Sequence, residues 1–194
     1  VSHIMGNPAK KEMKCGPKEL RKIVPGMIQK RLWGWFRRNG LPYAEEGYPL
    51  QIGEKWLLLH ATVDFHLDGF SIVRLDSIES IRKGNKKKGH QRILDAEGIT
   101  DRIATGLQRD LSDIAAILNP LKERQEIVIL DFEDYLYIGH IIKLGKKNLS
   151  FRCFNTNGRW EKKLSKIPYD TIEKIRFETE YGAVYEKHLI GGVP

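Results

Sequence analysis

Two segments of this 194-residue chain repeat one another, and this repeat limits the choice of fold more than any other feature. Residues 47–60 match residues 139–152 at a constant spacing of 92, with glycines and apolar side chains at the same places. Residues 76–82 match residues 170–176 at a spacing of 94, so the second copy has two extra residues in the loop between the matches. Because repeats decide the architecture before any motif does, we predict a duplicated fold.

Each copy is predicted to consist of short strands, because apolar and polar residues alternate between turn residues. Asn157-Gly158 is typical of a hairpin turn, since this pair readily adopts positive φ angles. Several short strands in one small unit favour a closed or half-closed barrel, which also removes most exposed sheet edge. The expected strands are residues 28–38, 43–52, 55–63, 69–75 and 77–82 in the first copy, and residues 126–131, 135–144, 148–154, 160–167, 171–177 and 182–188 in the second.

A helical connector is expected between the copies. Residues 110–118 have an apolar stripe, with Asp110 or Ser112 as the cap and Asn119-Pro120 as the stop, and a shorter helix is expected at residues 91–97. A helix this short is marginal alone, so it should pack on one barrel or wedge between both. We thus predict a mainly β chain of two tandem small β-barrels with a short helical connector. The expected divisions are residues 1–25 (tag remnant and basic arm), 26–84 (first barrel), 85–122 (basic loop and connector) and 123–190 (second barrel).

The barrel pattern resembles the Sm-like small barrels of the wider SH3-like group. Gly139-His140-Ile141 stands where that fold bends its second strand, and residues 73–81 (Val-Arg-Leu-Asp-Ser-Ile-Glu-Ser-Ile) resemble its second signature. The chain is also similar to a bacterial family of uncharacterised proteins with two such barrels. The resemblance implies barrels that assemble into rings by pairing their edge strands. Two fused barrels could instead pair with each other, and assembly would end there.

The resemblance also implies an RNA site, but this chain departs from it. Sm-like barrels hold a uridine base with an Asp and then an Asn in the turn after the bent strand. Gly53 and Gly145 stand at the Asp position, and Asn148 lies one residue early. We therefore expect the usual ring-pore RNA site to be absent.

The first candidate site interleaves aromatic residues with cations. Bases stack on aromatic side chains while cations pair with phosphates, and single strands are bound in this way without sequence preference. The alternative, which we favour, is that the two tryptophans share one face of a strand and belong to the core. The candidate residues are Lys30, Arg31, Trp33, Trp35, Arg37 and Arg38.

The second candidate site is a basic loop between the first barrel and the connector. Clustered cations release counterions when they neutralise phosphates, which gives salt-sensitive binding. A solvated loop without a ligand is the more common meaning of such a charge run. The net charge of +8 permits an anionic partner without proving one. The candidate residues are Lys83, Lys86, Lys87, Lys88 and Arg92.

A third candidate, with weaker support, is a metal site. Alternation along a strand would bring His60, Asp64, His66 and Asp68 to one face, and imidazoles with carboxylates can hold zinc. Asp68-Gly69 is itself a turn signal, however, so the strand is expected to end before the face is complete. We therefore expect no metal here.

Enzyme motifs are missing from the sequence, and we expect a protein that binds and does not catalyse. No phosphate-binding glycine loop, nucleophile elbow or HExxH helix is found, and we expect no cofactor. Cys153 lies in mid-strand, where a buried structural thiol is expected. The leading hypothesis is binding of RNA or single-stranded nucleic acid. The alternative is a protein-interaction module that docks a peptide or subunit on barrel edges or in the groove between the barrels.

The expected location is the cytoplasm. No apolar run approaches the roughly 20 residues that cross a bilayer. The two cysteines lie far apart in the sequence, which suggests no disulfide framework and favours a reducing compartment. The sequence leaves the oligomeric state open.

Overall fold

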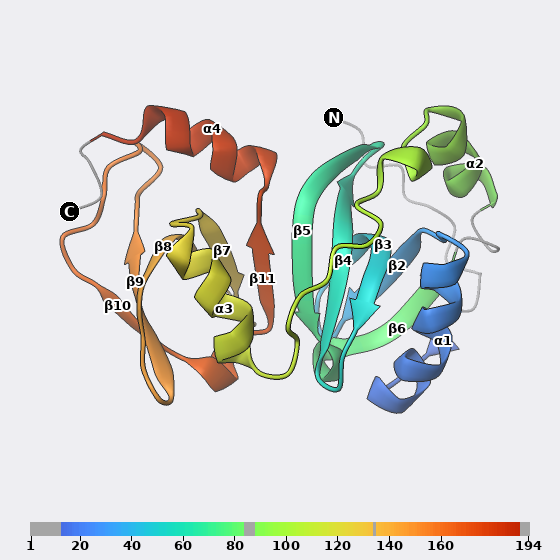
Figure 1. Cartoon of the computed structure of the whole chain (residues 1–194), viewed down its shortest axis with the longest axis horizontal. Helices are drawn as coiled ribbons and strands as arrows, with labels where there is room; N and C mark the ends of the chain where they lie inside the picture. Colours follow the sequence, from blue (N-terminus) through green and yellow to red (C-terminus); the bar gives the residue numbers. More distant parts are fainter. Residues whose placement is uncertain (1–12, 84–87, 134, 191–194) are drawn as a thin grey trace.

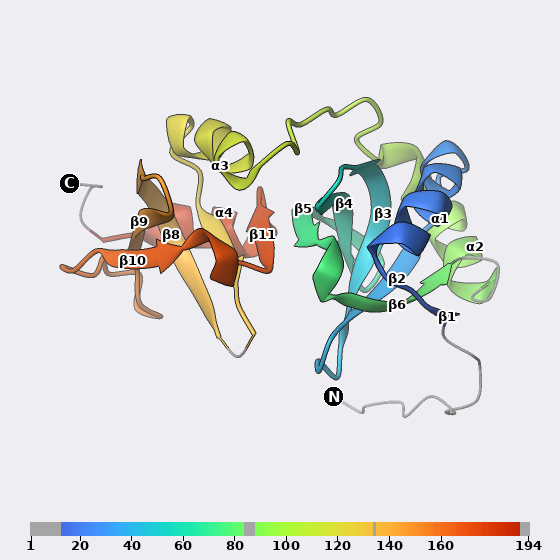
Figure 2. The ribbon, with the colours of Figure 1, turned by 90° about the horizontal axis from the view of Figure 1, so that it is seen from below.

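One antiparallel sheet dominates the structure, a computed structural model that describes residues 13–83, 88–133 and 135–190. The expected mainly β class is therefore confirmed. From edge to edge, the described strands run β1, β6, β2, β3, β4, β5, β11, β7, β8, β9, β10 (Figures 1 and 2). The strands are β1 (Met13–Lys14), β2 (Gly34–Arg38), β3 (Ala44–Ile52), β4 (Trp56–Val63), β5 (His66–Arg74), β6 (Ile78–Lys83), β7 (Val128–Asp131), β8 (Leu136–Leu144), β9 (Asn148–Cys153), β10 (Ser165–Pro168) and β11 (Lys174–Phe177). The helices are α1 (Pro17–Gln29), α2 (Lys88–Ala96), α3 (Ile114–Glu123) and α4 (Glu180–His188).

The strands fall into a first group, β2–β6, and a second group, β7–β11, with matching registers. Within each group the last strand returns to pair with the first, β6 with β2 and β11 with β7. The register between β3 and β4 shifts after Pro49, and that between β8 and β9 shifts after Ile141, 92 residues later. Corresponding pairs are Gly47↔Ala61 and Gly139↔Cys153, Leu57↔Val73 and Leu149↔Ile167, and Phe36↔Ile81 and Leu130↔Ile175.

The two groups join where β5 pairs with β11, from Phe70↔Phe177 to Val73↔Lys174. At this junction the backbones of residues 69 and 178 approach so closely that only glycine fits at position 69. Gly69 has a φ of +62°, and a Cβ there would lie 2.3 Å from the carbonyl oxygen of Glu178. At the opposite edge of the first group, β1 pairs with β6, as Figure 2 shows.

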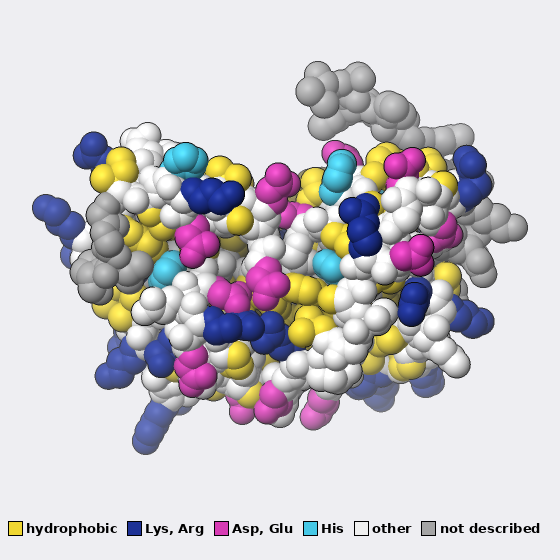
Figure 3. All heavy atoms as spheres, turned by 45° about the horizontal axis from the view of Figure 1, so that its top comes forward, with side chains coloured by type: hydrophobic (Ala, Val, Ile, Leu, Met, Phe, Trp, Pro, Cys, Tyr) yellow, Lys and Arg dark blue, Asp and Glu magenta, His cyan; other side chains and the backbone are white. Residues whose placement is uncertain are grey.

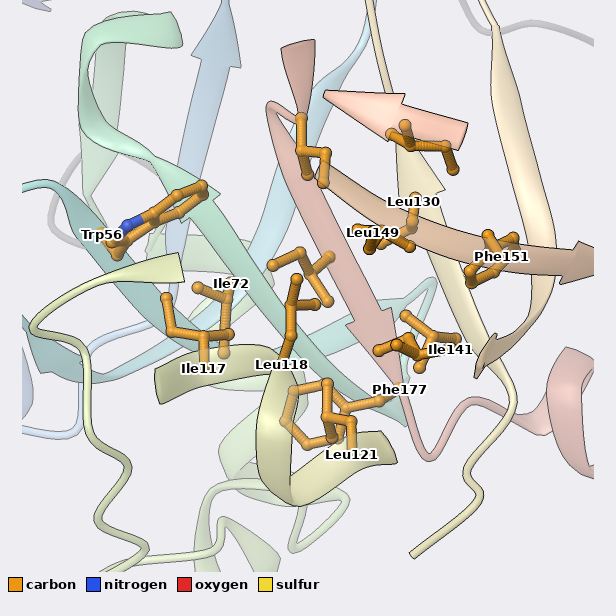
Figure 4. Close-up of a cluster of buried hydrophobic side chains, with 14 of the residues drawn as sticks. Trp56, Ile72, Ile117, Leu118, Leu121, Leu130, Ile141, Leu149, Phe151 and Phe177 are labelled. Atoms are coloured by element: carbon orange, nitrogen blue, oxygen red, sulfur yellow. The ribbon is translucent and has the colours of Figure 1, made fainter. Parts of the chain in front are cut away.

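The main core is shared by both groups. Helix α3 contributes Ile117, Leu118 and Leu121, which pack between side chains of the first and second groups (Figure 4). Of the two expected placements of the connector helix, on one copy or between both, α3 takes the second. The strand residues labelled around it are Trp56 and Ile72 from the first group and Leu130, Ile141, Leu149, Phe151 and Phe177 from the second.

The strand expected at residues 28–38 begins only at Gly34, because the chain is still helical in α1 up to Gln29. Leu20, Val24 and Met27 recur at helical spacing and are buried against the first group, so burial favours a helix over part of the expected basic arm and the residues that follow it. Arg31, with a φ of +48°, follows the helix end before β2 begins.

Two other expectations about helices were wrong. Helix α3 begins after Asp113, whose carboxylate accepts from the Ala116 N–H, and it continues through Pro120 because Leu121 is buried in the shared core. Residues 182–188 form α4 and not a strand, because the Thr179 hydroxyl caps a helix by accepting from the Gly182 N–H. The strand expected at residues 160–167 is limited to β10.

No helix in the described ranges combines the length and apolar character that a membrane crossing requires.

Candidate nucleic-acid interface

Trp33 of the first candidate site is a core residue. Its side chain is fully buried, packs with Tyr48 and Leu94, and donates its indole N–H to the Thr62 hydroxyl (2.9 Å between Nε1 and Oγ1). The Trp33 and His90 rings lie 4.2 Å apart between centroids. A base therefore cannot stack on Trp33 without disrupting the core.

Trp35 of β2 is half-buried and packs against the same cluster of buried side chains as Trp33, as expected for two tryptophans on one face. The Arg82 guanidinium lies 4.4 Å from the Trp35 ring centroid, a cation–π arrangement. Beside it, Arg37 forms an ion pair with Glu79, with 2.6 Å between Nε and Oε1. These cations are already engaged within the protein.

Arg38 is the centre of a buried ionic network and is only 1% exposed. Its guanidinium contacts Glu173 and lies 3.6 Å from Glu45. Lys174 of β11 binds the same Glu45 carboxylate at 2.7 Å and lies 3.5 Å from Asp131. Because the network joins β2 and β3 to the second strand group, Arg38 has a structural role and is unavailable to a ligand.

The remaining candidate cations of these two sites are exposed, or their side chains lie outside the part of the chain that the structure describes. Lys30 and Arg31 are exposed after α1, and Arg92 is exposed on α2. The backbones of Lys83 and Lys88 belong to β6 and α2. Lys86 and Lys87 lie outside the described residues.

The four candidate metal ligands are not grouped around one metal position among the described residues. The turn of the β4–β5 hairpin lies at Asp64-Phe65, not at Asp68-Gly69, because Val63 pairs directly with His66. His60 is buried beside Phe70, and its Nδ1 accepts from the Ala104 N–H at 3.1 Å; burial lowers the pKa of this imidazole. Among the residues that the structure describes, no three His, Cys, Asp or Glu side chains are grouped to hold a metal.

Both cysteines are buried and free of disulfides. Burial, aided by the nearby Glu19 carboxylate, raises the pKa of the Cys15 thiol to about 11. Burial also raises the pKa of Cys153. Because a raised pKa keeps the thiol protonated, both side chains are poor nucleophiles.

A stronger cationic surface lies in the second group, and the sequence analysis missed it. Residues 143–166 contain eight Lys or Arg against a single acid, Glu161. They form no ion pair with any other described residue. Their net charge was visible in the sequence but is spread over two strands and two loops, with no run longer than two. Six lysines are exposed: Lys143, Lys146, Lys147, Lys162, Lys163 and Lys166.

The register brings part of this charge onto one face. Lys143 of β8 and Lys166 of β10 both pair with Ser150 of β9, and directly opposed residues share a face. Two strand spacings place the lysine backbones about 10 Å apart. Phe151 and Ile167 alternate with these residues and are buried, so the row lies on the outer face of the sheet. Figure 3 shows Lys and Arg side chains along the outer margin of this lobe.

An aromatic side chain lies at one end of the same face. Trp160 bridges to Phe154, which directly follows β9. Phe154 lies two residues after Arg152, and Arg152 pairs with His140. The partly exposed Trp160 ring stands edge-on to His140, with 4.9 Å between centroids. We call Lys143, Ser150, Arg152, Trp160 and Lys166 the outer β8–β10 face. It offers cations and an aromatic ring on one rigid surface.

Comparisons with protein families, curated proteins and solved structures return no match for this chain.

Proposed function

We propose that the chain consists of two tandem small barrels of the Sm-like kind, fused through the β5–β11 pairing. The matched registers of the two strand groups support this proposal. So do the bends at Gly47 and Gly139, where a Cβ would lie 2.4 and 1.9 Å from carbonyl oxygens of the neighbouring strand. Only glycine permits that approach, and it occurs at equivalent positions in both groups.

We further propose that the protein binds RNA or other single-stranded nucleic acid through the outer β8–β10 face, and that it acts by binding and not by catalysis. The observation that carries this proposal is the set of exposed cations in residues 143–166 that have no ion-pair partner among the described residues. Contacts between such lysines and phosphates are favourable, because they release counterions from the nucleic acid. Trp160 supplies an aromatic surface beside them, which suits unpaired bases.

Edge protection is the structural alternative for these lysines. Lys166 lies on β10, an edge strand, and lysines on such strands prevent pairing with other chains. That role explains Lys166 and also suits Pro168 at the end of the same strand. It does not explain Lys143 and Arg152 on interior strands, whereas a polyanion ligand accounts for all three.

The test is the salt dependence of binding. Fluorescence anisotropy of a labelled, mixed-sequence single-stranded RNA would be measured over a range of salt concentrations. Lys143→Gln/Lys166→Gln should weaken binding and reduce the slope of log K against log salt by about 1.4, because each phosphate contact contributes about 0.7 for single strands. Arg31→Gln/Arg92→Gln, which removes two exposed cations outside the second group, should leave the slope unchanged. An unaltered slope in the lysine variant would reject the outer β8–β10 face.

A further inference from the structure

A groove lies between the two strand groups, at the top of the molecule in Figure 1. Its walls are the tip of the β4–β5 hairpin and helix α4, and its volume is about 440 Å³. That volume is within the range of small ligand pockets. Figure 3 shows the corresponding notch between the two lobes.

The apolar lining of the groove is unusually exposed. Val63 is 56% exposed, and on α4 Tyr181 is 53% and Val184 is 49% exposed. Adjacent exposed apolar side chains on a small protein mark interaction surfaces more often than isolated ones do. Covering them would remove apolar surface from water, which favours binding.

The polar lining of the groove is mostly acidic. Asp64, Asp68 and Glu180 contribute carboxylates and His66 contributes an imidazole, and none of the described lining residues is Lys or Arg. Neither Asp64 nor Glu180 forms an ion pair with another described residue. In a chain of net charge +8, this surface has the opposite character to the outer β8–β10 face.

The two walls are fixed to each other. The Asp68 carboxylate accepts from the Glu180 N–H at 2.7 Å, which ties β5 to the start of α4. Further along the helix, the Tyr185 ring packs against Phe154 (4.9 Å between centroids), and its hydroxyl donates to the Thr156 carbonyl. The groove is therefore preformed, so little ordering is needed when a ligand binds.

We propose that this groove docks a cationic segment of a partner protein. An apolar side chain of the segment packs against Val63, Tyr181 and Val184, and flanking Lys or Arg side chains pair with Asp64 and Glu180. Charge complementarity selects this occupant, because the same carboxylates repel nucleic acid. The proposal does not depend on nucleic-acid binding by the outer β8–β10 face, and together the two surfaces would make the protein an adaptor.

The test uses two labelled probe peptides and fluorescence polarisation at physiological salt. In one peptide leucines alternate with arginines, and in the matched peptide glutamates replace the arginines. The full chain should bind the arginine peptide and not the glutamate peptide. Val184→Lys should weaken binding about tenfold, as expected for the loss of a central apolar contact. Asp64→Asn/Glu180→Gln should weaken it as well, whereas Leu164→Lys, at an exposed apolar position outside the groove, should not.

Circular dichroism of each variant checks that folding is intact. Equal binding of the arginine peptide by the wild type and the two groove variants would overturn the proposal, as would equal binding of both peptides. Sedimentation velocity adds a further outcome: self-association of the wild type that Val184→Lys abolishes would assign the groove to a second copy of the chain and reject the partner peptide.

Discussion

Cations gather near tryptophans in two regions of this protein, and the two regions use them differently. In β2 and β6, Arg37, Arg38 and Arg82 are all engaged by other side chains, and Trp33 is fully buried. On the outer β8–β10 face, Lys143 and Lys166 are exposed and have no partner among the described residues. The number of Lys and Arg residues in a segment therefore does not show whether they are free to bind a ligand. That depends on whether side chains on neighbouring strands already engage them.

The largest expected effect breaks the buried network. Arg38→Ala leaves Glu45 and Glu173 without this partner, and loss of one member of a buried ion pair costs about 3–5 kcal/mol. Urea denaturation should show this loss in the free energy of unfolding.

Lys166→Ala is the matched change on the exposed face, where surface substitutions usually stay within about 0.5 kcal/mol. The two variants should rank in the opposite order by RNA affinity. Lys166→Ala should bind RNA more weakly than the wild type, and Arg38→Ala should bind it equally well under conditions where the variant is folded. Equal stability of the two variants would contradict the contrast between the regions.

The tryptophans provide the next effect. Trp160→Ala should weaken binding of single-stranded RNA by about 1–3 kcal/mol, which is the usual contribution of one stacked base. Trp33→Phe should instead lower stability by about 1–3 kcal/mol, because the Thr62 hydroxyl loses its buried partner. Anisotropy and thermal denaturation on both variants separate the roles. Weaker RNA binding in Trp33→Phe with Trp160→Ala unaffected would restore the first region as the site.

The smallest effect concerns pH. Burial lowers the pKa of His60 below its ordinary value of 6.5, so the unfolded chain takes up the proton first as the pH falls. The stabilising contribution is complete above about pH 6.5 and is lost as the pH falls toward the folded pKa. Unfolding free energies measured from pH 7 to pH 5 should therefore decline less for His60→Gln, in which an amide oxygen can still accept from Ala104. An identical decline in both proteins would show that His60 is not the group responsible.

Much of the strand pattern was predictable, because glycines and alternating apolar residues fix local geometry. The spacing of 92 between Gly47 and Gly139 recurs unchanged in the strand pairings. Helix α4 was harder to predict from the sequence, since residues 182–188 also suit a strand. Only the Thr179 cap favours the helix over the strand.

The site could not be read from local sequence, because partners distant in the chain determine it. The burial of Arg38 depends on Glu173, 135 residues away. The outer β8–β10 face depends on register, since Lys143 and Lys166 become neighbours only when both pair with Ser150. A count of charges over residues 143–166 would have drawn attention to the segment, but not to the face.

Ultraviolet crosslinking of single-stranded RNA to the full chain, followed by peptide mass spectrometry, tests the central claim most directly. The crosslinked peptides should come from residues 143–166, with Trp160 among the modified residues, and Lys143→Gln/Lys166→Gln should reduce their yield. Crosslinks confined to residues 30–38 and 82–92 would contradict the claim and assign nucleic-acid binding to the first strand group.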